Sequence, residues 1–254
     1  MSTGTTDVTP AARAEIAPTG MLRVGLNMGN FLLTGKVPET GEPRGIAVDL
    51  GRELARRLGV PVEFIGYPTP GELAEAATFG AWDVGFLGAE PQRAKDIDFT
   101  AAYVEIEATY LVPSGSPIRE IPDVDRPGMR IAVPEKSAYE LYLARTLKHA
   151  NLMRTKGGDA AFKLFVDDKL DALAGLRPRL VKDHAKLPGS RIIYGRFTAV
   201  QQAIGIPRGR VAGAKYLREF VEDIKASGLV ARTIDQNGVR GLTVAPLSGD
   251  PEKK

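Results

Sequence analysis

Short apolar runs alternate with amphipathic segments along most of this chain. The run LRVGLN at 22–27 is typical of a buried strand. After Gly45, three leucines recur at the spacing of one helical face, and Gly59 is well placed to end that helix. Four further apolar stretches are expected to be strands: 60–67, 82–87, 129–134 and 170–176. A helical segment follows all of them except 82–87. Strands that alternate with helices predict an α/β fold with a mostly parallel, helix-covered sheet.

The strand–helix pattern falls into two sets, because a second one begins near Pro122. Two extended stretches, 105–112 and 201–206, link the sets. We therefore predict two lobes joined by two extended hinge crossings, with the ligand cleft between the lobes at the carboxyl ends of strands. The expected division is a flexible N-terminal tail at 1–20 with a short helical turn near Arg13 to Ile16, lobe 1 from 21–108 and 199–243, lobe 2 from 109–198, and a C-terminal tail at 244–254.

The composition of the chain argues against several classes of function. The net charge of +3 is small and the basic residues are interspersed with acidic ones, which argues against a nucleic-acid partner. No window is apolar over the roughly 18 residues that a membrane span needs, so no span is expected. Cysteine is absent, which excludes disulfides, thiolate metal sites and a cysteine nucleophile. The two histidines, His149 and His184, suit solvated helix ends better than catalysis, and we predict neither a metal site nor a cofactor.

The N-terminal segment 1–20 lacks the charged and apolar regions of a secretory signal. As written, the chain is expected to be cytoplasmic. If a signal was removed and a new start added, the expected compartment is the periplasm.

The stretch 80–110 carries the clearest sign of a binding site. An apolar strand at 84–87 stops at a glycine-containing loop, and Arg93 follows. The planar guanidinium of arginine binds a carboxylate through two parallel hydrogen bonds, and a loop after a buried strand places it at the rim of a cleft. Spacing alone suits an exposed surface arginine equally well.

Three local motifs, in this order, resemble the family 3 extracellular solute-binding proteins, the amino-acid receptors of ABC importers, which have the two-lobed type II periplasmic binding fold. The first is the strand-to-helix junction at 43–60, and the third is the closing helix pair at 216–238. The second is the run at 82–103. The residues that match the family positions in the first two motifs are Gly45, Asp49, Leu50, Asp83, Arg93, Phe99, Thr100 and Tyr103. The resemblance covers about residues 20–241.

The resemblance implies that Arg93 pairs with a ligand carboxylate. It also implies a second-lobe anion contact at a helix start, where Ser137 and Lys136 stand. A plain helix N-cap is the alternative role for Ser137, and the two roles are compatible. An ABC permease is implied as a protein partner.

Other positions depart from the family pattern. Leu176 stands where the family carries an aspartate for the ligand's α-ammonium group, and Arg177 follows it. The usual Ser/Thr cluster is replaced by Gly88, Ala89 and Glu90, and the aromatic of the first loop by Asn30, with Asn27 and Phe31 nearby. We therefore predict a small carboxylate ligand, an amino acid or a related organic acid, whose ammonium contact is lost. Arg177 would be suited to a second acidic group on that ligand.

Two other functions fit the same scaffold. One is an enzyme similar to the cyclohexadienyl-dehydratase-like lyases, with Glu90, Glu105 and Glu107 as candidate acids or bases. Glu105 and Glu107 share one strand face, where solvated hinge charges are the favoured interpretation. The other is a cytoplasmic ligand sensor without chemistry.

Overall fold

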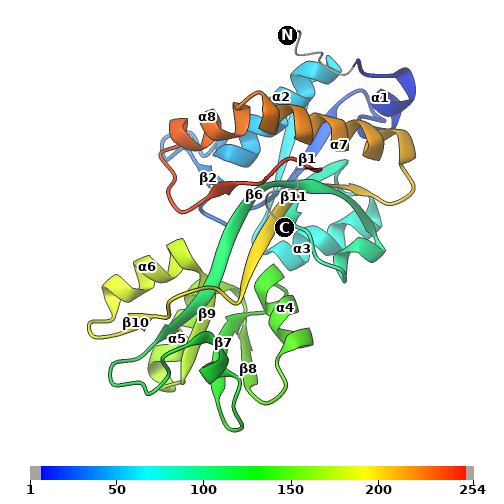
Figure 1. The fold of residues 1–254 in the computed structure, drawn as a ribbon. Helices are drawn as coiled ribbons and strands as arrows, with labels where there is room; N and C mark the ends of the chain where they lie inside the picture. Colours follow the sequence, from blue (N-terminus) through cyan, green and yellow to red (C-terminus); the bar gives the residue numbers. More distant parts are fainter. Residues whose placement is uncertain (1–6, 250–254) are drawn as a thin grey trace. The chain divides into compact units, whose positions relative to one another are not determined.

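The computed structural model describes residues 7–249, and the chain divides into two compact units. Met1–Glu105 and Gln201–Lys254 form unit 1, and Ile106–Val200 forms unit 2. Two strands cross the boundary: β6 (Ile97–Val112) and β11 (Thr198–Pro207). They correspond to the two extended links of the sequence, and the predicted α/β fold is confirmed (Figure 1).

The sheet of unit 1 has the strand order β4-β1-β5-β11-β6. β1 pairs in parallel with both β4 and β5, whereas β11 runs antiparallel to β5. The strands of this unit that lie outside the boundary crossings are β1 (Leu22–Asn27), β2 (Gly35–Lys36), β3 (Pro43–Arg44), β4 (Val62–Tyr67), β5 (Val84–Gly88) and β12 (Thr243–Val244). The helices are α1 (Pro10–Ile16), α2 (Ile46–Leu58), α3 (Pro70–Ala76), η1 (Ala77–Phe79), η2 (Arg93–Lys95), α7 (Val211–Ala226) and α8 (Leu229–Gln236).

Glycines lie at both ends of α2, and the one at its carboxyl end was expected from the sequence. Gly45 has φ +117°, and a Cβ atom there would lie 2.5 Å from the carbonyl oxygen of Leu33, so only glycine fits. Gly59 ends the helix in the left-handed conformation, with φ +65°.

Unit 2 has the strand order β6-β9-β7-β8, with β10 antiparallel to β6. Its own strands are β7 (Arg130–Pro134), β8 (Asn151–Thr155), β9 (Ala172–Leu176) and β10 (Arg191–Ile192). Its helices are η3 (Ile121–Val124), α4 (Ala138–Thr146), α5 (Gly157–Asp167) and α6 (Arg177–Lys186). Successive residues of a strand face opposite sides of the sheet. Tyr110 and Ala172 belong to one apolar cluster, whereas their neighbours Leu111 and Leu173 belong to another, so both faces of the sheet are covered.

Parts of both expected tails belong to helices and strands of unit 1. The expected tail at 1–20 contains α1, whose Ile16 is buried and which lies beside α7 (Figure 1). The expected tail at 244–254 begins inside a strand, because β12 pairs with β6 and the buried Nζ of Lys225 donates a hydrogen bond to the carbonyl oxygen of Pro246 at 2.8 Å. The helical turn expected near Arg13 and Ile16 is the last part of α1. Residues 1–6 and 250–254 of the two expected tails lie outside the described residues.

Candidate functional site

Three parallel strands of unit 1 end at one edge of its sheet. β1, β4 and β5 finish at Asn27, Tyr67 and Gly88. The carboxyl ends of parallel strands in open α/β sheets are where ligands bind. The last residues of β1 and β5 are the predicted residues Asn27 and Gly88, and the loops that follow carry Asn30, Phe31, Glu90 and Arg93.

Arg93 is buried, with 6% of its surface exposed, so the interpretation as a solvated surface charge is wrong. Its Nη1 donates a hydrogen bond to the carbonyl oxygen of Gly88 at 2.6 Å, and its backbone N–H donates to the carbonyl oxygen of Glu90 at 3.0 Å. Burial lowers the pKa of the Arg93 guanidinium to about 10, while the charge of Glu90 acts in the opposite direction. The loop after β5 thus holds a desolvated cation in a fixed position.

The predicted residues of the first loop mainly shape that loop. The side-chain oxygen of Asn27 accepts a hydrogen bond from the N–H of Gly29 at 3.1 Å. Asn30 is buried, and its side-chain oxygen accepts from the N–H of Leu32 at 3.2 Å. Phe31 lies between these turns and is exposed. It is therefore the residue of this loop best placed to offer an apolar surface.

In unit 2, the parallel strands β7 and β9 likewise end at one edge, and α4 and α6 begin there. Ser137 is the N-cap of α4: its hydroxyl accepts from the N–H of Glu140 at 3.2 Å and donates to the carbonyl oxygen of Pro134 at 2.9 Å. The N–H of Lys136, which has φ +56°, donates to the side chain of Glu140. Because the single hydroxyl proton is engaged, an anion here would be held by the first N–H groups of the helix, at 138 and 139.

Leu176 ends β9 and lies opposite Ala108 of β6. Arg177, the first residue of α6, is already engaged: its Nε donates to Oε2 of Glu107 at 2.8 Å, and its Nη2 donates to the carbonyl oxygen of Gly195. The sequence did not indicate this pairing, because the two side chains lie 70 positions apart. Glu105 lies on β6 opposite Thr243 of β12, in unit 1.

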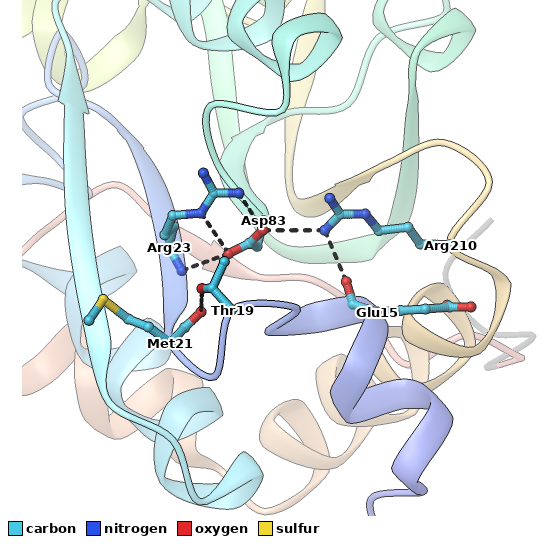
Figure 2. Close-up of polar contacts among 6 residues, drawn as sticks. All are labelled: Glu15, Thr19, Met21, Arg23, Asp83 and Arg210. Carbon is cyan, nitrogen blue, oxygen red and sulfur yellow. Dashed lines mark hydrogen bonds and ion pairs between the residues drawn. The ribbon is translucent and has the colours of Figure 1, made fainter.

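Asp83 lies at the opposite edge of the unit 1 sheet, where β5 begins. It lies just before β5, has no exposed surface, and accepts hydrogen bonds from the backbone N–H of Arg23 and from Nε and Nη2 of its guanidinium, at 3.1, 3.0 and 2.8 Å. Figure 2 shows this carboxylate between Arg23 and Arg210, whose Nη1 also donates to the carbonyl oxygen of Glu15. Sequence reasoning matched Asp83 to a motif but missed both arginines, although a charge inside an apolar strand was a signal for Arg23. This cluster fastens the amino ends of β1 and β5.

Among residues 7–249, no group of three or more His, Cys, Asp or Glu side chains is arranged to hold a metal ion. Within the same range, no helix combines the length and apolar character needed to cross a membrane.

Comparison with known proteins identifies a family for most of the chain. The family model described as bacterial extracellular solute-binding proteins, family 3, matches residues 22–238. A search of curated proteins finds no match.

Solved structures similar to this chain include the ancestral amino acid-binding protein AncCDT-1, a precursor of cyclohexadienyl dehydratase, at 24% identity and a TM-score of 0.72, covering 89% of this chain and 98% of that one. They also include a solute receptor for L-cysteine of Neisseria gonorrhoeae, at 19% identity and a TM-score of 0.76, covering 90% and 95%. A third is a P235GK mutant of ArgBP from T. maritima, at 22% identity and a TM-score of 0.73, covering 89% and 99%. At these identities, the likeness establishes a shared fold.

Proposed function

Because the chain belongs to the bacterial extracellular solute-binding proteins of family 3, we propose that it is a receptor for a small carboxylate-bearing ligand. Arg93 pairs with the ligand carboxylate, and the two units close around the ligand by bending at the crossings β6 and β11. The closed receptor delivers its ligand to an ABC permease. The family's description as extracellular favours the periplasm over the cytoplasm as the place of action.

The observation that carries this proposal is the buried state of Arg93. A carboxylate that reaches this guanidinium can bind it with two parallel charge-assisted hydrogen bonds, and such bonds are stronger away from water. The bond from Nη1 to Gly88 holds the guanidinium in place before any ligand arrives, which reduces the ordering cost of binding.

The second element of the proposal is that the ligand needs no α-ammonium group. Leu176 offers an apolar side chain where the family motif has a carboxylate, and an ammonium group buried against it would be unpaired. Glu107, the neighbouring carboxylate on β6, is already paired with Arg177. Glu90, close to Arg93, is the alternative source of negative charge, and the experiment below includes it.

A thermal-shift panel tests the proposal on the full chain. Each of several amino acids is compared with its 2-oxo and 2-hydroxy analogues, and arginine, lysine and cysteine are included because similar proteins are named for them. We expect the deaminated acids to stabilise the protein at least as well as the parent amino acids. Stabilisation by standard amino acids alone would contradict the loss of the ammonium contact, and repeating the panel on Glu90→Gln then shows whether Glu90 supplies that contact.

A further inference from the structure

A carboxylate flanked by two guanidinium groups lies at the edge of unit 2 where β9 ends. Oε2 of Glu107 lies 2.8 Å from Nε of Arg177, and its Oε1 lies 3.7 Å from Nη1 of Arg196. The register of β6 and β9 places the cluster at the carboxyl end of β9, because Ala108 is opposite Leu176. Glu107, Arg177 and Arg196 all belong to unit 2, so this geometry is internal to one unit.

We propose that Glu107 determines ligand specificity by acting as a built-in carboxylate. It occupies the two cations that would otherwise receive a second acidic group of the ligand, so the receptor selects monocarboxylates over dicarboxylates. This inference rests on the proposed function and specifies the class of ligand within it.

The exposure of the cluster supports a role in selection rather than in folding. The side chains of Glu107 and Arg177 are 44% and 32% exposed, and ion pairs in such positions contribute little to stability. The same exposure leaves the cluster open to small solutes. A second carboxylate arriving there meets the negative charge of Glu107 as well as the two cations, and like charges at close range disfavour binding.

The charges in the cluster predict how the ligand preference should change when Glu107 is neutralised. With Glu107 in place, the cluster holds one anion and two cations, and Arg177 is further held by the carbonyl oxygen of Gly195. Glu107→Gln keeps the size of the side chain and one acceptor oxygen but leaves both guanidinium groups without a counter-charge. The variant becomes suited to a dianionic ligand.

The matched control is Asp171→Asn. Asp171 precedes the other end of β9 and pairs with Arg130, Nε to Oδ2 at 3.7 Å, with a side chain 37% exposed. This variant removes one negative charge from a similar pair in the same unit, at the amino end of the strand and away from the edge where β9 ends.

The experiment measures binding of chain-matched acids by calorimetry: 2-oxovalerate against 2-oxoglutarate, and butyrate against succinate. We expect the wild type and Asp171→Asn to prefer the monocarboxylate of each pair. In Glu107→Gln, the ratio of affinities should move toward the dicarboxylate by about tenfold or more, as for removal of one repelling charge at close range. Circular dichroism checks that all variants fold.

Three results overturn the inference. The first is a wild type that prefers dicarboxylates, which would mean that the ligand displaces Glu107. The second is an unchanged ratio in Glu107→Gln. The third is an equal change in Asp171→Asn.

Arg93→Ala separates this inference from the proposed function. If the acids bind in an Arg93-dependent way while the ratio of affinities stays fixed, only the role of Glu107 is contradicted. If no acid binds, the proposed function falls with it.

Discussion

Arg93 is the residue on which the proposed ligand contact depends. Arg93→Ala removes the cation, and affinity for the best acid of the thermal-shift panel should fall by about 2–5 kcal/mol, as for buried charge pairs that lose one partner. Arg93→Lys should recover only part of this, because an ammonium group cannot form two parallel bonds to a carboxylate. Calorimetry measures both variants, with the exposed Arg56→Ala as control. Unchanged affinity in Arg93→Ala would remove this residue from the site.

Asp83 is expected to affect stability and leave binding unchanged. Its fully buried carboxylate is shared by Arg23 and Arg210, so Asp83→Asn leaves two cations without their counter-charge and should lower the free energy of unfolding by about 3 kcal/mol. Asp98→Asn, which breaks a surface contact with Arg208, should cost less than about 1 kcal/mol. Urea unfolding compares the two variants. A large loss of ligand affinity in folded Asp83→Asn would contradict its placement at the amino edge.

Within α2, Glu53 makes stability depend on pH. Hydrogen bonds from Arg56, and also from Arg57, lower the pKa of the Glu53 carboxyl to about 2. A carboxyl whose pKa is lower in the folded chain stabilises it above the unfolded value, about 4.3, and this stabilisation is lost as the pH falls toward 2. Between these values, the unfolding free energy of the wild type should fall more steeply than that of Glu53→Gln. Urea titrations at several pH values measure this, and the two curves should run parallel from pH 7 to 5. Equal slopes at low pH would be evidence against the shift.

β12 is held in place by one lysine of α7. The side chain of Lys225 is 2% exposed and pairs with Glu222 at 2.9 Å in addition to its bond to Pro246. Lys225→Ala removes both contacts and should lower the unfolding free energy by about 1–3 kcal/mol. The segment after Val244 should then be cut faster in limited proteolysis followed by mass spectrometry. Exposed Lys215→Ala is the control, and equal cutting rates in both variants would contradict a fastening role.

The elements that the sequence predicted are those that depend on local pattern. Apolar periodicity located the main strands and α2, and the glycine at 59 located the end of that helix. Three short motifs in order predicted the family, which the match over residues 22–238 confirms. Composition and spacing are sufficient for these features because each depends on neighbours within one element.

The features that the sequence did not predict depend on pairs of side chains that are distant along the chain. The partners Glu107 and Arg177, or Asp83 and Arg210, meet only once the sheet has formed, and no local spacing distinguishes them from solvated charges. The burial of Arg93 is of the same kind, because spacing suited a surface position equally well. The ligand roles of Ser137 and Asn30 stay predictions, since the visible contacts of both side chains serve a helix cap and a turn.

At the scale of the whole molecule, the proposed closing motion predicts a change in size. Only β6 and β11 cross between the units, so a ligand that contacts both units should shift the population toward a closed form. Small-angle scattering should give a smaller radius of gyration when a binding acid is added to the wild type, and no change with Arg93→Ala. A radius that stays constant at saturating ligand would contradict hinge closure.

The division of the chain also has a consequence for its synthesis on the ribosome. Unit 2 is one continuous stretch, whereas unit 1 needs β11, α7, α8 and β12 from the final fifty residues or so. When residue 200 has left the ribosome, all of unit 2 is available to fold, but β5 still lacks the part of β11 that pairs with it, residues 202–205. An apolar strand with an open edge is prone to pair with other chains, so this interval is when the nascent protein is most exposed to aggregation. The part of the chain that is made first is therefore the part that finishes folding last.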